Sequence, residues 1–169
     1  MHGLWSRIGL KGAVIGAIIL AALVFILVNV IRDAAPAPVN IAAGSRFPCT
    51  VLSVWDGDGP INCAEQDMDG KQIAVRLRGI EARETDDSCR PAELCPKMSG
   101  ADAKDMLTRL AVGRLDCTSH GPSYNRVDAR CRNASGQDLS CEMIRSGAAT
   151  RWPQYDPKGE LLACVPRQG

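Results

Sequence analysis

The sequence of 169 residues has no excess of charge of either sign. Its 20 Lys and Arg side chains are matched by 19 Asp and Glu side chains, which gives a formal net charge of +1. Residues 1–33 hold three of the basic and one of the acidic side chains, so the rest of the chain has 17 basic and 18 acidic residues. This balance argues against a globally basic nucleic-acid-binding protein. An anionic substrate would have to be attracted by a local cluster of arginines.

Histidine is scarce, internal repeats are absent, and the cysteines never occur in closely spaced pairs. The only histidines are His2 and His120, and no C-x-x-C motif is present, so the ligand spacing of a structural zinc site is missing. His120 lies in a Gly-Pro loop and is expected at the surface. The even number of cysteines, all after the apolar N-terminal segment, predicts disulfide bonds formed in an oxidising compartment. They are Cys49, Cys63, Cys89, Cys95, Cys117, Cys131, Cys141 and Cys164.

The N-terminal part contains the one long hydrophobic run. Residues 12–31 are uncharged throughout, and as a helix they would span about 30 Å, the hydrocarbon thickness of a bilayer. Arg7 and Lys11 precede the run and predict a cytoplasmic N-terminus over residues 1–11. We therefore expect a single-pass transmembrane signal anchor in the cell membrane with an extracytoplasmic C-terminal domain. Secretion after signal cleavage near residues 33–35 is the alternative.

The rest of the chain is predicted to be a linker, residues 32–45, followed by one domain, residues 46–169. The linker is rich in small residues and proline and lacks periodicity. The domain begins with three strand candidates, the last two separated by an Asp-Gly turn. A helix over 100–112 capped by Ser99, two strands over 113–118 and 125–132, and a short helix from Asp138 to Ser146 follow. This order predicts a mainly β fold, a five-stranded OB-type barrel with two to three helices.

Three short polar stretches combine residues suited to phosphate chemistry. They are residues 56–58 (Asp-Gly-Asp), 76–84 (Arg-Leu-Arg-Gly-Ile-Glu-Ala-Arg-Glu) and 124–126 (Tyr-Asn-Arg). Each alone is an ordinary turn or strand end. Together they supply arginine forks for phosphate oxygens, carboxylates for a hard divalent cation and a further carboxylate to activate a water. These groups form one complete set for hydrolysing a phosphodiester.

The same stretches resemble the motifs of the staphylococcal nuclease (thermonuclease) family. That family has a D-G-D-T turn, then R-L-x-G-I-D-A-P-E, then Y-G-R, and this sequence reads D-G-D-G, R-L-R-G-I-E-A-R-E and Y-N-R at matching spacing. The resemblance covers about residues 47–156 and includes the segment Gly147-Ala148-Ala149 and two aromatic residues after it. It implies an OB-type barrel and a calcium-dependent nuclease acting on DNA or RNA.

The resemblance also implies roles for single residues. The calcium ligands would be Asp58, Glu81 and the backbone carbonyl of Ala82. The catalytic residues would be Arg76 and Arg126, which bind the scissile phosphate, and Glu84, the general base. The substrate-binding residues would be Tyr124, near the nucleotide, and Trp152 or Tyr155, stacked on a base.

Three positions depart from the family pattern. Gly59 replaces a threonine whose hydroxyl can support the metal shell. Glu81 replaces an aspartate, and Arg83 replaces a proline and so frees φ beside the predicted base. None of the three replacements removes a required charge. Because a misplacement of about 1 Å can lower a rate on the order of 100-fold, we expect reduced activity. Three further arginines, Arg78, Arg83 and Arg90, either extend the phosphate-binding face or are solvated or paired with acidic residues. For Arg90 we expect the second alternative.

In the resembling family a variable loop beside the active site corresponds to residues 85–100. A bridge between Cys89 and Cys95 would rigidify this loop. The barrel would place Cys49–Cys63 and Cys117–Cys131 on adjacent strands, which leaves Cys141–Cys164. Spacing alone leaves the pairing open, because eight cysteines allow on the order of 100 connectivities.

The primary hypothesis is therefore a membrane-anchored extracytoplasmic nuclease that hydrolyses phosphodiester bonds with calcium. The alternative is a catalytically weakened module of the same fold that binds nucleic acid or a protein partner at the membrane. A structural part of an envelope or DNA-transfer assembly is a third hypothesis. The sequence leaves open whether the substrate is DNA or RNA, and magnesium or manganese could use the same ligands.

Overall fold

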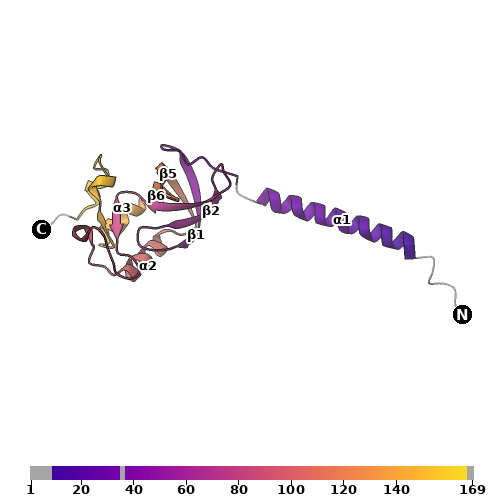
Figure 1. Cartoon of the computed structure of the whole chain (residues 1–169), viewed down its shortest axis with the longest axis horizontal. Helices are drawn as coiled ribbons and strands as arrows, with labels where there is room; N and C mark the ends of the chain where they lie inside the picture. Colours follow the sequence, from indigo (N-terminus) through magenta and orange to yellow (C-terminus); the bar gives the residue numbers. More distant parts are fainter. Residues whose placement is uncertain (1–8, 35–36, 167–169) are drawn as a thin grey trace. The chain divides into compact units, whose positions relative to one another are not determined.

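The computed structural model describes residues 9–34 and 37–166, and the chain divides into two compact units between residues 36 and 37. The first unit contains helix α1 (Gly9–Ala34), so the apolar run is helical (Figure 1). Within the described residues, no helix has the length and hydropathy needed to cross a membrane. The predicted transmembrane span over residues 12–31 is thus not confirmed, and residues 1–8 of the predicted cytoplasmic segment lie outside the described residues.

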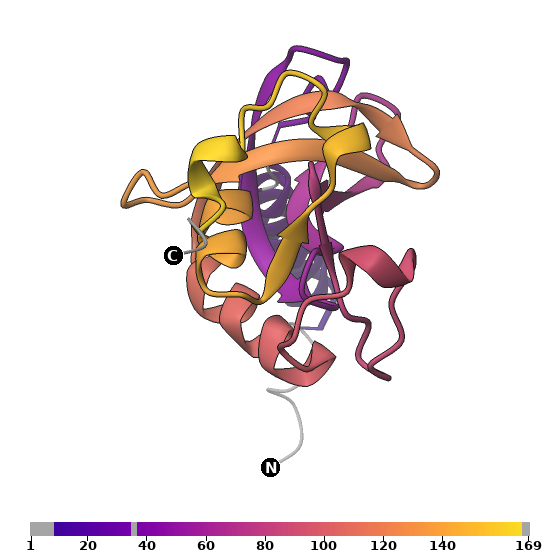
Figure 2. The same ribbon diagram turned by 90° about the vertical axis from the view of Figure 1, so that its left-hand side faces the viewer.

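The second unit is built around a closed barrel of five strands (Figure 1, Figure 2). The order around the barrel is β1-β2-β3-β6-β5, and neighbouring strands are antiparallel except for the parallel pair of β3 and β6. The strands are β1 (Arg46–Val54), β2 (Ile61–Gln66), β3 (Gln72–Leu77), β5 (Arg114–Ser123) and β6 (Arg126–Arg132). The prediction of a mainly β domain with a five-stranded barrel is confirmed.

Alternation of apolar and polar residues places the arginines of the barrel on its outer surface. Successive strand residues point to opposite faces, so the buried residues Ile73, Val75 and Leu77 of β3 leave Arg76 on the outside. In β6 the buried residues are Val127, Ala129 and Cys131, which leaves Arg126 and Asp128 outside. In the parallel register Arg76 of β3 lies opposite Asp128 of β6, so the outward-facing residues of the two strands, including Arg76 and Arg126, lie on one face.

Four disulfide bonds cross-link the domain, and all four predicted pairings are confirmed. Cys49–Cys63 joins β1 to β2, and Cys117–Cys131 joins directly paired residues of β5 and β6. The other two bridges are Cys89–Cys95 and Cys141–Cys164. Disulfide bonds of this number indicate an oxidising environment outside the cytoplasm.

Two helices lie where the sequence predicted them. Helix α2 (Gly100–Leu110) begins after Ser99, whose Oγ accepts a hydrogen bond of 3.2 Å from the backbone N–H of Asp102. Helix α3 (Leu139–Arg145) begins after Asp138, whose Oδ1 accepts from the backbone N–H of Cys141 at 3.1 Å. Each cap satisfies a backbone donor of the first helical turn, which fixes where the helix starts.

A second, small sheet lies beside the barrel and was not predicted. Strands β4 (Ile80–Ala82) and β7 (Ala149–Arg151) pair in antiparallel fashion, and Glu81 faces Thr150 in the register. Three residues are too few for a periodic pattern, so the sequence gives no strand signal here. This sheet links the end of the 76–84 stretch to the segment after α3.

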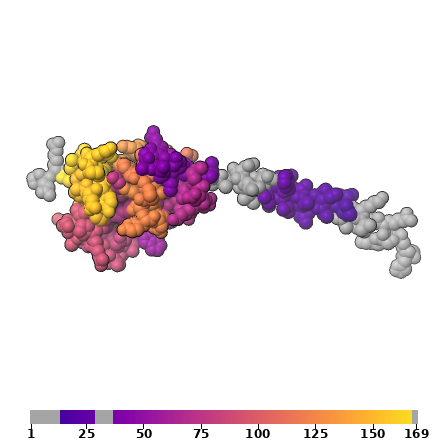
Figure 3. All heavy atoms as spheres, turned by 45° about the horizontal axis from the view of Figure 1, so that its top comes forward, coloured from indigo at the N-terminus to yellow at the C-terminus, as the bar shows by residue number. Residues whose placement is uncertain are grey.

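Short 3₁₀ helices complete the domain: Ala92–Leu94, Pro153–Tyr155 and Leu162–Cys164. In the space-filling view, C-terminal residues (yellow) and the segment of residues 85–110 (rose) form part of the same face of the domain (Figure 3).

The domain begins earlier than predicted. The backbone N–H of Val39 donates to the carbonyl of Gln66 at 2.9 Å, and the hydroxyl of Ser119 donates to the carbonyl of Ile41 at 2.7 Å. Residues 37–45 are therefore part of the compact unit, and the predicted linker over residues 32–45 is too long. Val39 and Ile41 also pack against the core, but two apolar residues in nine give no clear periodic pattern.

Candidate functional site

The Asp-Gly-Asp turn follows β1 and is pressed between α2 and β4. A Cβ added at Gly57 would lie 2.6 Å from the Cβ of Ala103 and 2.7 Å from the Cβ of Ala82, so only glycine fits there. The carbonyl of Asp58 accepts a hydrogen bond of 2.9 Å from the backbone N–H of Leu77. The turn is thereby fixed to the end of β3, and the carboxylate of Asp58 lies beside the outward-facing Arg76.

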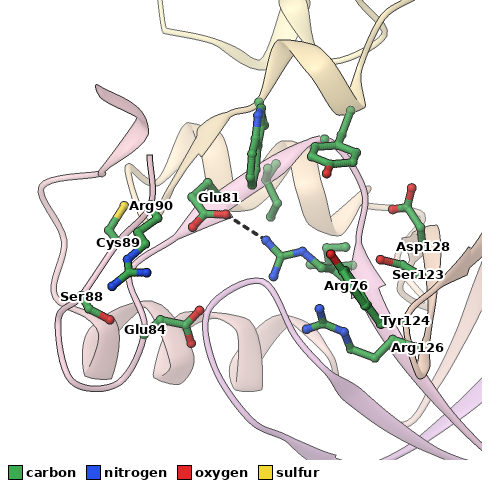
Figure 4. Close-up of a pocket in the computed structure, with 15 residues that line it drawn as sticks. Arg76, Glu81, Glu84, Ser88, Cys89, Arg90, Ser123, Tyr124, Arg126 and Asp128 are labelled. Atoms are coloured by element: carbon green, nitrogen blue, oxygen red, sulfur yellow. Dashed lines mark hydrogen bonds and ion pairs between the residues drawn. The ribbon is translucent and has the colours of Figure 1, made fainter. Parts of the chain in front are cut away.

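Arg76 joins the first two stretches. Its Nη1 and Nη2 donate to Oδ1 and Oδ2 of Asp58 at 2.9 Å and 2.7 Å. Nη2 also donates to Oε2 of Glu81 at 2.9 Å, the contact drawn as a dashed line in Figure 4. The backbone N–H of Ala82 donates to Oδ2 of Asp58 at 3.3 Å. The two predicted carboxylate ligands therefore converge on one nitrogen of one guanidinium.

Four carboxyl groups gather around this arginine, and each has a raised pKa. Burial raises the pKa of Asp58 to about 6 although Arg76 lowers it, and burial together with the charge of Asp58 raises the pKa of Asp56 to about 6. Burial also raises the pKa values of Glu81 and Glu84. One guanidinium does not neutralise the group, which favours uptake of protons or a cation.

Asp56 and Glu84 are neighbours in this group. Burial, and after it the neighbouring Asp56, raises the pKa of Glu84. Asp56 is buried, with 5% exposure, whereas Glu84 is exposed. The predicted general base thus lies at the solvent side of a buried carboxyl group.

The second and third stretches meet at a cavity of about 460 Å³. Seven of the nine predicted site residues line it: Arg76, Glu81, Glu84, Tyr124, Arg126, Trp152 and Tyr155. In the close-up, the guanidinium groups of Arg76 and Arg126 and the carboxylate of Glu84 point toward a common space (Figure 4). Asp58 and Ala82 do not line the cavity, because they are buried with 2% and 3% exposure.

Arg126 differs from the neighbouring arginines in having no acidic partner. Arg78 pairs with Asp128, and Arg130 pairs with Asp138. Arg126 forms no ion pair in the described part of the chain, and its buried Nε has no hydrogen-bond partner there. A buried donor without a partner costs free energy, so Arg126 is suited to receive an anionic ligand.

Aromatic side chains lie along the same cavity. Tyr124, in the turn between β5 and β6, is 97% exposed and has a positive φ of 57°. The rings of Trp152 and Tyr155 are in T-shaped contact with centroids 4.7 Å apart, and the backbone N–H of Trp152 donates to the carbonyl of Gly79 at 2.7 Å. These rings offer apolar surface next to the arginines.

The departures from the family motifs have local explanations. Gly59 has φ of 110°, and a Cβ there would lie 2.5 Å from the carbonyl oxygen of Val75, so threonine does not fit in this backbone. Arg83 was expected to loosen the backbone beside Glu84. Instead its Nε donates to the carbonyl of Pro96 at 2.9 Å and its Nη1 donates to the carbonyl of Asp87 at 2.8 Å.

The structure adds residues to the site that the sequence did not assign. The cavity is also lined by Ser88, Cys89, Arg90, Ser123 and Asp128. Arg90, which was expected to be solvated or paired, is exposed and also borders the cavity.

His120 is exposed, as predicted, and lies at a different cavity with Arg130 and Arg132. Burial and the charge of Arg78 lower the pKa of its imidazole. Because Arg130 is paired with Asp138 and Glu160, this second cavity has balanced charge.

The predicted metal ligands fit a cation in part. The carboxylates of Asp58 and Glu81 approach one positively charged nitrogen at 2.7 Å and 2.9 Å, little more than the 2.3–2.6 Å of calcium–oxygen bonds. Of Ala82, only the N–H is observed to contact this group. Among the residues that the structure describes, no group of three or more His, Cys, Asp or Glu side chains is arranged to bind a metal ion.

Comparison of the sequence with protein-family models and with curated proteins finds no match.

Proposed function

We propose that the domain is an OB-type nuclease that hydrolyses phosphodiester bonds of DNA or RNA with the help of a divalent cation, with calcium the expected one. One observation carries the proposal. Arg76, Arg126 and Glu84 come from three separate segments, yet they line one cavity, and Arg126 there has a charge that no acidic side chain of the described residues neutralises.

The two arginines are suited to bind the scissile phosphate. A guanidinium donates two parallel hydrogen bonds to phosphate oxygens and stays charged at any physiological pH. Arg126 is available for this in the absence of substrate, whereas Arg76 is bound to Asp58 and Glu81. As negative charge develops on the phosphate, both guanidinium groups would stabilise it.

Glu84 is suited to accept a proton from the attacking water. It is exposed and lines the cavity, so it can contact water and substrate together. Burial of the acidic cluster raises its pKa, which makes it a stronger base than an ordinary carboxylate. The neighbouring Asp56 contributes to this raised pKa.

Asp58, Glu81 and the Ala82 carbonyl would hold the cation, which supplies positive charge beside the scissile phosphate when bound. The longer side chain of Glu81 reaches the same point as that of Asp58, since both contact Nη2 of Arg76. Replacement of the family's aspartate by glutamate is therefore compatible with a shared ligand position.

The aromatic residues support a substrate with unpaired bases. Tyr124, Trp152 and Tyr155 lie at the cavity, and unstacked bases pack on such rings with about 1–3 kcal/mol per base. We propose single-stranded nucleic acid as the preferred substrate form. The disulfide bonds support action outside the cytoplasm, and anchoring of the domain by residues 12–31 remains a prediction from the sequence.

A second candidate function is nucleic-acid binding without turnover. It is favoured by the engagement of Arg76, because both predicted ligands, Asp58 and Glu81, already form ion pairs with the same nitrogen of its guanidinium. In that case the cavity would bind a phosphate through Arg126 and lack the cation that hydrolysis needs.

Incubation of the full, disulfide-bonded chain with end-labelled single-stranded DNA and RNA separates the two functions. The nuclease predicts shortened products with calcium and intact substrate with chelator. Binding of the same oligonucleotides without shortening, in calcium, magnesium and manganese alike, would support the binding module and contradict the nuclease.

A further inference from the structure

The segment between β4 and α2 forms one wall of the cavity. We call residues 85–99 the disulfide loop, because Cys89–Cys95 closes its central part. Ser88, Cys89 and Arg90 of this loop line the cavity beside Glu84. The loop begins with a tight turn, in which the N–H of Glu84 donates to the carbonyl of Ser88 at 2.8 Å and the N–H of Asp87 donates to the carbonyl of Glu84 at 2.9 Å.

One side chain contacts both arms of this loop. Arg83 donates from Nη1 to the carbonyl of Asp87 and from Nε to the carbonyl of Pro96. Asp87 precedes Cys89 and Pro96 follows Cys95, so the guanidinium binds the two arms just outside the bridge. Both acceptors are backbone carbonyls, so the contact depends on the path of the chain and not on the side chains of the loop.

Helix α2 limits the position of Glu84 from the other side. A Cβ added at Gly100 would lie only 1.7 Å from the carbonyl oxygen of Glu84, and the N–H of Gly100 donates to Oδ1 of Asp87 at 2.7 Å. The backbone of Glu84 is thus in direct contact with the first residue of the helix. It cannot move toward the helix, and Arg83 restricts movement of the loop away from it.

We propose that Arg83 is a positioning residue for Glu84 and for the cavity wall. A proline at this position would restrict the chain by fixing its own φ. Arg83 restricts it through two charge-assisted hydrogen bonds, which are stronger than neutral ones. The position of Glu84 therefore depends on the disulfide loop being in place. The kinetic consequence of this inference rests on the proposed function, whereas the structural consequence does not.

Amide hydrogen exchange of the full, disulfide-bonded chain tests the positioning directly, because the N–H of Glu84 is itself hydrogen-bonded within the turn. In Arg83→Gln we expect the amides of Glu84 and Asp87 to exchange at least about tenfold faster, with those of α2 unchanged. Arg83→Lys, which keeps the charge but cannot reach both carbonyls with one fork, should recover part of the protection. Arg145→Gln is the control, since Arg145 is exposed on α3 and contacts only Glu142 there.

The second readout separates kcat from KM for cleavage of single-stranded DNA. Arg83 itself does not line the cavity, so its loss should act mainly on kcat, lowering it on the order of 10- to 100-fold through displacement of Glu84, with a smaller change in KM from the loosened wall. Unchanged exchange at Glu84 in Arg83→Gln would overturn the inference, as would faster exchange with an unchanged kcat. If the wild-type chain does not cleave, the proposed function fails, and the exchange of Glu84 alone then decides whether Arg83 positions it.

Discussion

The guanidinium of Arg76 binds the carboxylate of Asp58 in bidentate fashion, with Nη1 2.9 Å from Oδ1 and Nη2 2.7 Å from Oδ2. In the proposed site these residues have different partners, since Asp58 binds a cation and Arg76 binds a phosphate. Without ligands each satisfies the other, which limits the cost of burying the Asp58 carboxylate. The pair therefore connects cation binding to phosphate binding.

Stability should fall as pH rises from about 4 to 6 in the presence of a chelator. The folded-state pKa values of Asp56 and Asp58, both about 6, lie above the ordinary value of 3.8, so the folded chain binds more protons than the unfolded chain in this window. Each of the two groups then lowers the free energy of unfolding by on the order of 2–3 kcal/mol as the pH rises through this window. Thermal unfolding from pH 4 to 7 measures this.

Asp56→Asn is the matched variant for that experiment. It removes one of the two groups, so its stability should change less with pH and should exceed that of the wild type at pH 7. Equal pH profiles for variant and wild type would contradict the account of the acidic cluster.

Calcium should raise the melting temperature at pH 7 and have a smaller effect at pH 5, where protons compete for the same carboxylates. At a concentration one hundred times the Kd the expected stabilisation is about 2.7 kcal/mol. Glu81→Gln should lose most of this effect. Glu142→Gln, a change at a half-buried carboxylate on α3, should keep it. A calcium effect of equal size in both variants would place the cation elsewhere.

Gly59 should resist replacement, including replacement by the threonine of the resembling family. The residue has φ of 110°, and an added Cβ would lie 2.5 Å from a backbone oxygen. Gly70 also has positive φ, but no atom lies near its added Cβ. We expect Gly70→Ala to cost about 1 kcal/mol and Gly59→Ala to cost about 2–3 kcal/mol more. Chemical denaturation measures both, and equal costs would contradict the close contact.

Arg126→Gln should weaken binding of single-stranded oligonucleotides in chelator, where no turnover takes place. Removal of one charged hydrogen bond to a phosphate should lower the affinity for the oligonucleotide about tenfold or more. Arg132→Gln on the same strand is the control, because Arg132 does not line the cavity and lies 3.8 Å from Asp138. Equal losses in both variants would indicate general attraction by the strand and not a site at Arg126.

The barrel could be predicted because its strands alternate and its cysteines and helix caps mark the connections. In β6, for example, buried and outward residues alternate from Arg126 to Arg132. The small sheet of β4 and β7 could not be predicted, because each strand has three residues and pairs with a segment far away in sequence. The place of residues 37–45 in the domain could not be predicted, because backbone hydrogen bonds and two apolar contacts, Val39 and Ile41, form no periodic pattern.

The sequence predicted that three stretches contribute to one site, and residues of two of them, 76–84 and 124–126, line the cavity. What could not be predicted is which arginine is free. Arg76 and Arg126 look alike in sequence, yet Arg76 is bound by two carboxylates and Arg126 by none among the described residues. The hydrogen bonds of Arg83 could not be predicted either, since its acceptors are backbone carbonyls that no side-chain pattern reveals.

The most direct test of the central claim is the rate at which Glu84→Gln cleaves single-stranded DNA in calcium. Asp86→Asn is the matched control, because Asp86 is an exposed carboxylate two residues away that does not line the cavity. The account predicts that Glu84→Gln lowers kcat at least about 100-fold at unchanged melting temperature, while Asp86→Asn cleaves like the wild type. Wild-type cleavage by a folded Glu84→Gln chain would contradict it.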